Sequence, residues 1–445
     1  MIAFALAVIL LPGAVVNGLR WLRVAQREHY LPGTTAKFAW RWRWHAAGLG
    51  VRGRTSKLAW TRRMKLLAAV AGVLQVVLIV AIGLLTHSWP IALIVGVILV
   101  PAVIDAALAV TKPIESQLAK PFVNQAAAKL RAIHPTVVAI TGSYGKTSTK
   151  VLLAHLVQGT RTVSASPASF NNRAGLARAI NEGLAPGTDV FVAEMGTYGK
   201  GEIAELCAWC PPDIAVITAI GPVHLERMKS EDNIVAAKSE IFANAKTVVL
   251  NVDDPRLAAL ADTITDKTVI RASASQLDFP LDHLPTAPTN VACAIAVALE
   301  LGVSRHDVLA RLKTAPSAAH RLVATTAPSG VVVLDDTFNS NPAGARRALA
   351  ALADAGTGRK VLITPGMIEL GPRQATENEA LAADASKVAD VIGVVGKTNR
   401  PALTRGATTK VELFANRAAA VEWVRANLGP GDAVLYENDL PDHYR

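Results

Sequence analysis

The sequence predicts an α/β protein in which three amino-terminal transmembrane helices precede a mainly parallel α/β domain and a smaller second α/β domain. Three apolar runs lie within the first 110 residues, each near the roughly 20 residues that cross a bilayer as a helix. Further along, β-branched strands alternate with Ala-rich helical segments, as in parallel sheets covered by helices. The length of 445 residues fits three such parts, at about 150 residues per domain.

Composition excludes several classes of protein. Apolar residues make up 51% of the chain and the mean hydropathy is +0.31, which excludes a disordered or collagen-like chain. The net charge is +11, but residues 1–65 hold 12 basic residues against one acid, Glu28, and the rest of the chain is balanced. Because the basic excess belongs to one short segment, we expect no nucleic-acid partner. The three cysteines exclude a disulfide framework and suit a reducing compartment.

The first element in order is a membrane region over residues 1–112. Signal-peptide cleavage is an alternative for the first apolar run, but that run lacks a basic segment ahead of it and its positive charges follow it. The positive-inside rule places the Arg- and Lys-rich loop and everything after residue 111 in the cytoplasm. The prediction is a multi-pass plasma-membrane protein with cytoplasmic catalytic domains. Its spans lie at about 1–19, 66–86 and 89–110, and the basic loop covers 20–65.

Tryptophan is concentrated in this region. Six of the eight tryptophans precede residue 90, and most alternate with arginine in the loop 20–65. Indole and guanidinium groups together suit the headgroup layer, so membrane lipid is the predicted partner of this loop. Aromatic and basic residues also occur in nucleic-acid sites, but the position between two spans favours lipid. Asp105, inside the third run, is either a functional polar group or a residue near the cytoplasmic interface.

The next element is a phosphate-binding turn in the segment HPTVVAITGSYGKTSTKVLLAHL. A strand, Val137 to Ile140, leads into a glycine turn and then a helix near Lys146. Such a turn directs backbone N–H groups at an anion, while the lysine reaches the terminal phosphates and Thr147 ligates Mg²⁺. An ordinary glycine-containing strand–helix turn is the alternative. Two residues, not the usual four, separate Gly142 from Gly145.

The segment TGSYGKT resembles the nucleotide loop of the Mur ligase superfamily. Further blocks look like that family's successive motifs, in its order, and most resemble the subfamily that adds D-alanyl-D-alanine to the peptidoglycan precursor. They are FVAEMGTYGKGEI (191–203), ITAIGPVHLERM (217–228), AAKSEIF (236–242), NVDDP (251–255) and DDTFNSNP (335–342). The resemblance implies ATP-dependent joining of a carboxylate to an amine through an acyl phosphate, with release of ADP and phosphate, in cell-wall biosynthesis.

The resemblance also implies a division into two enzyme domains. A central ATP-binding domain would cover 113–317, and a smaller Rossmann-like domain would cover 318–445. Apolar strands of the second domain are expected at 331–334, 361–364, 391–395 and 433–436.

Nucleotide-binding residues follow from the family match. Arg321 would lie on the phosphates and Asp336 on the ribose. The family's usual Gly-x-His-Asn-x-x-x-Asn stretch appears here as LPTAPTN, which leaves only its last asparagine and leaves the adenine contacts open. The full expected set is Gly142, Ser143, Gly145, Lys146, Thr147, Ser148, Asn251, Asn290, Arg321 and Asp336.

The family match implies two magnesium sites, held by Thr147, Glu194, His224 and Lys238. Glu194 ends an apolar strand, where ligands of open α/β sheets bind, and a solvated strand-end acid is the alternative. A lone histidine such as His224 is otherwise more often a hydrogen-bonded structural residue.

Lys238 stands on the apolar stripe of a predicted helix, four residues after Ile234. A buried ammonium group is costly, so it needs a partner or a change of charge. Similar Mur ligases carry a carbamylated lysine here, which would make Lys238 an anionic magnesium ligand. The alternative is a lysine that pairs with Glu240 or Glu231.

We expect Lys146, Lys238, His224 and Arg321 to carry catalysis, and Asn171 and Asn172 to face the substrate. Because residues 1–112 leave no polar α/β segment for a uridine nucleotide, the expected partners are a lipid-linked or cell-envelope precursor and an amino acid or short peptide. Spans that merely tether an enzyme with a soluble substrate are the alternative. Other functions that fit are a membrane-bound polyglutamate-type synthase and an inactive nucleotide-binding scaffold.

Overall fold

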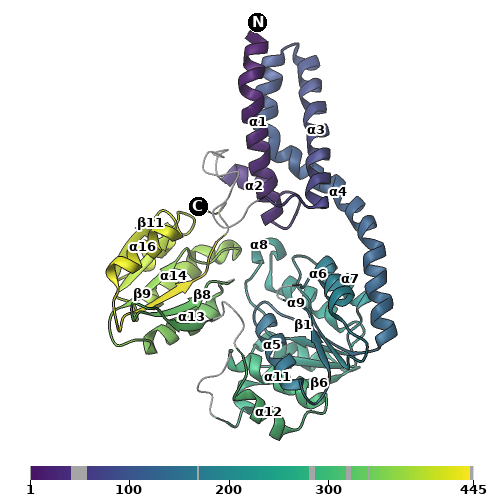
Figure 1. The fold of residues 1–445 in the computed structure, drawn as a ribbon, viewed down its shortest axis with the longest axis vertical. Helices are drawn as coiled ribbons and strands as arrows, with labels where there is room; N and C mark the ends of the chain where they lie inside the picture. Colours follow the sequence, from purple (N-terminus) through teal and green to yellow (C-terminus); the bar gives the residue numbers. More distant parts are fainter. Residues whose placement is uncertain are drawn as a thin grey trace. The chain divides into compact units, whose positions relative to one another are not determined.

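The computed structural model describes residues 2–41, 58–167, 170–279, 286–316, 322–338, 340–440 and 444, without the side chains of residues 1–12 and 14. The chain divides into two compact units, residues 1–120 with 440–445, and residues 121–439 (Figure 1). The domain boundaries expected from the sequence, after 112 and after 317, stay predictions.

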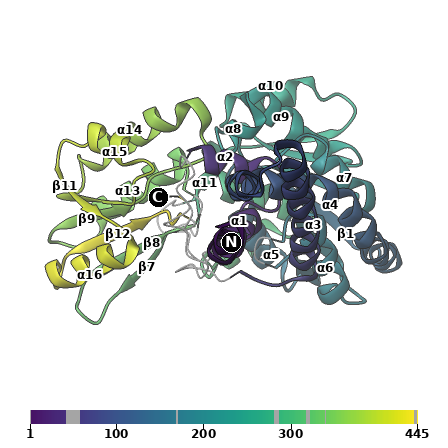
Figure 2. The ribbon, with the colours of Figure 1, turned by 90° about the horizontal axis from the view of Figure 1, so that it is seen from above.

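The described part of the amino-terminal unit is mainly helical. Its helices are α1 (Ile2–Arg27), α2 (Thr34–Arg41), α3 (Arg62–Thr86) and the start of α4 (Trp89–Ile133). Figure 2 looks along α1 from its amino-terminal end. In the described part of the chain, α3 and α4 are long and apolar enough to cross a membrane. The described residues therefore contain two candidate spans and not the three that the sequence predicted; α1 is a helix, but most side chains of its amino-terminal half lie outside the described residues.

Proline explains one contact within this unit. Pro101 has no N–H, so the carbonyl of Val97, one turn earlier in α4, lacks its helical partner. The side chain of Asn17 donates to that carbonyl at 3.3 Å, and Gln75 of α3 donates to the neighbouring carbonyl of Gly96 at 2.9 Å. Polar side chains of α1 and α3 therefore bind the backbone of α4.

Asp105 has a local structural role. Its carboxylate accepts the backbone N–H groups of Thr35 at 3.2 Å and Ala36 at 2.7 Å, in the first turn of α2. The first N–H groups of a helix have no partner within the helix, and an anion at this end is favourable. This buried acid of α4 thus caps a helix that lies 70 residues earlier in the sequence.

The second unit contains a six-stranded parallel sheet in the order β2-β3-β1-β4-β5-β6. The chain fills one side of β1 with β2 and β3 and the other side with β4 to β6, so the order reverses beside β1, where open α/β sheets bind ligands. The strands are β1 (Thr136–Thr141), β2 (Val163–Ala165), β3 (Val190–Glu194), β4 (Ile214–Ile217), β5 (Thr247–Asn251) and β6 (Thr268–Ala272).

Helices bury both faces of this sheet in two apolar clusters. One face packs against α5 and α11, and the other against α6, α7, α9, α10 and the end of α4. The connecting helices are α5 (Lys146–Val157), α6 (Arg173–Arg178), η2 (Ala179–Gly183), α7 (Glu202–Trp209), α8 (Leu225–Met228), α9 (Glu231–Ser239), η3 (Glu240–Phe242), α10 (Pro255–Thr263), η4 (Ala274–Gln276), α11 (Pro288–Glu300) and α12 (Arg305–Leu312).

A second six-stranded sheet has the order β11-β10-β9-β12-β8-β7, parallel except for the β7–β8 pair. This confirms an α/β fold with a parallel sheet and adds an antiparallel edge strand. Its elements are β7 (Val323–Thr326), β8 (Val332–Asp336), α13 (Pro342–Asp354), β9 (Lys360–Thr364), η5 (Gly371–Arg373), α14 (Gln374–Ala385), β10 (Val391–Val395), α15 (Arg400–Gly406), β11 (Lys410–Phe414), α16 (Arg417–Asn427) and β12 (Ala433–Glu437). Sequence reasoning missed β7 and β11.

Candidate active site

The glycine turn between β1 and α5 has the backbone that a phosphate cradle needs. Gly142 has φ +155° and Gly145 has φ +82°, both in the region that favours glycine. A Cβ atom at Gly142 would overlap the hydroxyl of Thr218, and one at Gly145 would overlap the amide of Asn290. Both glycines are therefore required by conformation and by close packing.

Two side chains after the turn are predicted to serve the nucleotide and its metal. The Lys146 ammonium folds back and donates to the carbonyl of Gly142 at 2.7 Å. The Thr147 hydroxyl donates to Glu194 at 3.0 Å, so the start of α5 and the end of β3 meet. The structure thus brings together the loop and the carboxylate that the sequence predicted beside it.

Lys150, which sequence reasoning did not single out, forms a buried ion pair with Glu194 at 2.9 Å. It lies one helical turn after Lys146, so the signal was the spacing of two lysines on one face of α5. Burial is the largest single cause and raises the pKa of Glu194, but the charges of Lys150 and Lys146 and the hydrogen bonds from Lys150 and Asn171 together lower it more. The net shift is downward, so Glu194 is an anion.

Lys238 is 5% exposed on the inner face of α9. Within the described part of the chain its ammonium has no hydrogen bond and no ion pair. Both neighbouring glutamates are engaged elsewhere: Glu240 accepts the N–H of Gly201 at 2.7 Å, and Glu231 pairs with Arg256 and Arg373. Burial, and then the charge of Lys146, put the pKa of Lys238 well below its usual value.

His224 follows β4 in a left-handed conformation with φ +58° and precedes α8. Its Nδ1 is hydrogen-bonded to the carboxylate of Glu369, which also accepts from Arg227 at 2.9 Å. Burial lowers the pKa of His224, Glu369 opposes this, and Lys146 and Lys238 lower it further. Lys146 therefore acts electrostatically on Glu194, His224 and Lys238 alike, so these predicted groups surround the loop.

Comparisons with known proteins identify the family to which the chain belongs. The Mur ligase middle domain matches residues 140–283, and the Mur ligase, glutamate ligase domain matches residues 320–436. The chain is 34% identical over 373 residues to the UDP-N-acetylmuramoyl-tripeptide–D-alanyl-D-alanine ligase of Mycobacterium leprae, an alignment covering 69% of this chain and 72% of that protein. The chain belongs to the Mur ligase family.

Solved structures agree with this assignment. MurF from Acinetobacter baumannii and MurF from Thermotoga maritima in complex with ADP are each 25% identical, with a TM-score of 0.63. Each alignment covers 72% of this chain, and covers 77% and 80% of those chains. As a Mur ligase the chain is an ATP-dependent enzyme of peptidoglycan synthesis that joins an acid to an amine through a carbon–nitrogen bond. Neither family match includes the first 120 residues.

Mur ligases use ATP and Mg²⁺, and the residues present fit both. Thr147 and Glu194 offer adjacent oxygen donors, which Mg²⁺ prefers, below a glycine cradle that excludes any Cβ atom. Among the residues that the structure describes, no three His, Cys, Asp or Glu side chains gather as a metal cluster. Mg²⁺ held by one or two protein oxygens and by phosphate oxygens needs no such cluster.

The predicted substrate-side asparagines differ from each other. Asn171 donates to Glu194 at 3.1 Å and so faces the carboxylate that is predicted to bind magnesium. Asn172 is the N-cap of α6, because its side chain accepts the N–H of Gly175 at 3.0 Å. A contact of Asn172 with substrate stays a prediction, and the structure gives this residue a local role.

The two asparagines predicted to contact adenine form hydrogen bonds within the protein. Asn251 donates to the carbonyl of Thr218 at 2.9 Å and so ties the ends of β4 and β5. Asn290 donates to Thr286 at 2.9 Å and packs on Gly145. Their roles toward adenine, and that of Ser148 in the loop, stay predictions.

Arg321 lies outside the described residues. Asp336 ends β8, and its carboxylate accepts the N–H of Leu322 at 3.1 Å. The neighbouring strand β12 ends in Glu437, a fully buried acid that sequence reasoning missed. Glu437 is hydrogen-bonded to Ser340 and, at 3.0 Å, to Thr364. Burial raises the pKa of Glu437 to about 7.

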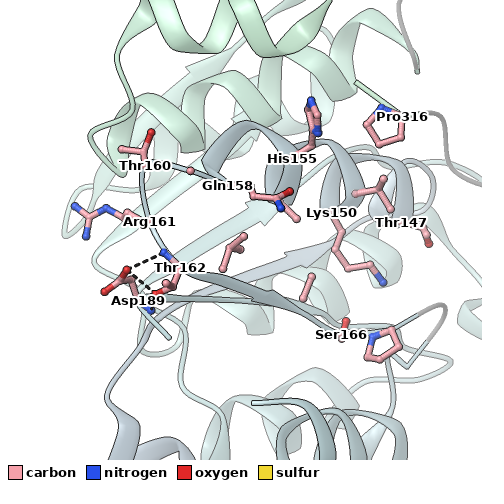
Figure 3. Close-up of a pocket in the computed structure, with 16 residues that line it drawn as sticks. Thr147, Lys150, His155, Gln158, Thr160, Arg161, Thr162, Ser166, Asp189 and Pro316 are labelled. Carbon is pink, nitrogen blue, oxygen red and sulfur yellow. Dashed lines mark hydrogen bonds between the residues drawn. The ribbon is translucent and has the colours of Figure 1, made fainter. Parts of the chain in front are cut away.

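A pocket of about 930 Å³ runs along α5 beside the edge strand β2. Figure 3 shows Thr147 and Lys150 at one end, and Arg161 and Asp189 at the other. The far end is fixed by Thr162, whose N–H and hydroxyl donate to Asp189 at 2.8 and 2.6 Å. This Mur ligase therefore has open space next to the ion pair of Lys150 with Glu194.

Proposed function

We propose that this chain is a membrane-anchored Mur ligase. It joins the carboxylate of a cell-wall precursor held at the membrane to the amino group of an amino acid or short peptide. The observation that carries the proposal is the segment of residues 1–120, which lies ahead of both family matches and whose described part is mainly helical. As a plasma-membrane protein it would keep its catalytic domains in the cytoplasm, where ATP is.

The exposed surface of α3 supports an anchoring role. Only 17% of its most apolar 18-residue window is buried within the protein. Val73, Val76 and Leu84 are more than 60% exposed and Leu85 is 81% exposed, which forms a continuous apolar surface. Such a surface is unfavourable in water and is typical of contact with lipid. The basic loop 20–65, rich in Trp and Arg, would add contacts with anionic headgroups.

The proposed reaction proceeds through an acyl phosphate. The substrate carboxylate takes the terminal phosphoryl group of ATP, the amine attacks the acyl carbon, and phosphate leaves as the amide forms. Lys146 would leave the carbonyl of Gly142 to hold the phosphate, and Arg321 would add a second cation. Thr147, Glu194, His224 and Lys238 would hold two Mg²⁺ ions, which neutralise phosphate charge.

Carbamylation would explain why Lys238 has no hydrogen-bond or ion-pair partner among the described residues. A neutral amine adds CO₂ and releases one proton, and burial favours the neutral amine. We predict that Lys238→Ala lowers turnover at least 100-fold and that a short carboxylic acid restores part of it by filling the vacated space. The exposed Lys246→Ala is the matched control and should keep full activity. Near-normal turnover by Lys238→Gln would remove this role.

The identity of the precursor that the enzyme uses distinguishes the proposal from its alternatives. The full chain in lipid vesicles, with ATP and D-alanyl-D-alanine, is offered the soluble uridine-linked and the lipid-linked forms of the same precursor. We expect a product mass on the lipid-linked form. Turnover of the soluble form alone would mean that the helices only tether the enzyme. A ladder of repeated mass additions would indicate a polyglutamate-type synthase, and nucleotide binding without product would indicate a scaffold.

Topology has its own test. Membrane-impermeant thiol labelling of intact cells should reach Ser88→Cys, between α3 and α4, and should not reach Thr55→Cys in the basic loop. The three natural cysteines are buried, so they give a low background. Efficient labelling at position 55 with none at position 88 would overturn the cytoplasmic placement.

A further inference from the structure

The loop that follows β9 contributes an acid to the imidazole of His224. Glu369 lies in this loop in a left-handed conformation, with φ +63°. One carboxylate oxygen is hydrogen-bonded to Nδ1 of His224, and the other accepts from Arg227 at 2.9 Å. The residues in this contact are 145 positions apart in the sequence.

The imidazole is also fixed on a second side. The ring of Tyr198 meets it edge to face, with centroids 4.8 Å apart. Arg227 lies over that tyrosine ring at 4.8 Å, so the same guanidinium touches both the ring and the carboxylate that hold His224. With Nδ1 engaged by Glu369, Nε2 is the nitrogen left to bind a ligand.

The segment that carries His224 is bound to the phosphate loop. The N–H of Ser143 donates to Ala219 at 2.7 Å, and the Ser143 hydroxyl donates to Gly221 at 3.2 Å. The orientation of this imidazole is therefore fixed relative to the loop on one side and to Glu369 on the other.

We propose that Glu369 is a positioning residue for the metal site. Its carboxylate accepts the Nδ1–H of His224, which fixes the tautomer and aims the Nε2 lone pair toward magnesium. The inference rests on the proposed role of His224 in holding that metal. Glu369 lies in the loop after a strand of the second sheet. His224 is therefore oriented to bind the metal only when this loop is in place.

The same loop offers a control that leaves His224 untouched. Gly371, with φ +57°, brings the loop against the backbone of Glu226, and Arg373 pairs with Glu231 at 2.9 Å. Arg373→Ala therefore removes a contact between the same two segments without removing the imidazole's partner.

The experiment measures Mn²⁺ binding by electron paramagnetic resonance, on the full chain in lipid nanodiscs with ADP. We expect Glu369→Ala to weaken binding 10- to 100-fold, the usual cost of losing the partner of a metal-binding histidine. Glu369→Gln should lose less, since its amide oxygen still accepts the Nδ1–H. The double variant Glu369→Ala/His224→Ala should bind no more weakly than His224→Ala alone, and Arg373→Ala should match wild type. Thermal unfolding of each variant checks that it is folded.

The outcomes separate this inference from the proposed function. Weaker binding by His224→Ala with unchanged binding by Glu369→Ala would overturn the positioning role and keep the proposed metal ligand. Unchanged binding by both variants would remove His224 from the proposed metal site and this inference with it. An equal loss by Arg373→Ala would assign the effect to seating of the loop and would overturn the role of Glu369 in orienting the imidazole.

Discussion

In each of the two sheets one strand ends in a buried glutamate, but the pKa values of these two glutamates are shifted in opposite directions. Glu194 ends β3 of the first sheet and Glu437 ends β12 of the second, with exposed fractions of 1% and 0%. Lys150 lies 2.9 Å from Glu194, whereas the side-chain hydrogen bonds of Glu437 come from the hydroxyls of Ser340 and Thr364. The pKa of Glu194 is lowered and that of Glu437 is raised to about 7.

This difference shows that the neighbouring charge, and not burial, decides what a strand-end acid does. Burial alone raises the pKa of a carboxyl group, and a cation within about 4 Å reverses the effect. The first sheet therefore presents an ionised carboxylate at the end of β3, beside the start of α5. The second sheet presents a carboxyl group that gains or loses its proton near neutral pH.

The largest effect should come from removing the cation of the first pair. Lys150→Met leaves Glu194 buried without its partner, and breaking such a pair by deleting one member typically costs about 3–5 kcal/mol. We expect the free energy of opening of β3, measured by hydrogen exchange, to fall by this amount. The pKa of Glu194 should rise, because the largest charge that lowers it is gone.

Two variants test whether the charge is responsible. Lys150→Arg keeps a cation and should keep most of the stability. Lys150→Met/Glu194→Gln removes both charges and should recover part of the loss, since no unpaired charge stays buried. A double variant as unstable as Lys150→Met alone would show that packing of the lysine stem, and not its charge, holds the strand.

The ion pair of Lys150 with Glu194 shows which features of the site could be predicted from the sequence and which could not. The glycine turn and Lys146 were predictable, because a strand, two glycines and a helix start are local patterns fixed by backbone conformation. Glu194 was predictable as a strand-end acid. Its pairing with Lys150 required the order of the strands, since β3 lies next to β1 only in the folded sheet.

Contacts between residues far apart in the sequence could not be predicted either, because they also depend on how the folded elements are arranged. Nothing in the periodicity of the sequence connects His224 with Glu369, or Asp105 with the start of α2. Of the three predicted spans, two lie on helices that are long and apolar enough to cross a membrane in the described part of the chain. Glu437 was missed because a single acid after an apolar strand looks like a solvated residue until the neighbouring strands bury it.

The next effect concerns the second sheet and depends on pH. Glu437 has a pKa of about 7 in the folded protein and a usual value of 4.5. Between these values the folded chain keeps a proton that the unfolded chain has lost, so stability falls as the pH rises from 4.5 to 7 and is level above it. The fall amounts to about 3 kcal/mol. Glu437→Gln should abolish this slope and be more stable than wild type at pH 8, measured by hydrogen exchange of β12.

The pH dependence of stability should also be measured for β3, by the same hydrogen-exchange method. The low pKa of Glu194 means that the first sheet loses stability at acid pH, as the carboxylate becomes protonated. The two sheets should therefore respond in different pH ranges: β3 should lose stability as the pH falls below 4.5 and stay level above it, whereas β12 should lose stability as the pH rises from 4.5 to 7. Parallel responses in both sheets would contradict the assignment of different charge states to Glu194 and Glu437.

The smallest effect should come from the hydroxyl that supports Glu437. Ser340 is hydrogen-bonded to one carboxylate oxygen, and this bond lowers the pKa of Glu437 against the larger effect of burial. Ser340→Ala should cost about 1 kcal/mol, the net value of one such bond. It should also move the pH midpoint of β12 stability upward, because the ionised form loses a donor and the neutral form loses less. In a Glu437→Gln background the same substitution should leave no pH midpoint to move. A midpoint shift that persisted there would mean that another group titrates at this sheet edge, and Glu437 would no longer be the acid that distinguishes the two sheets.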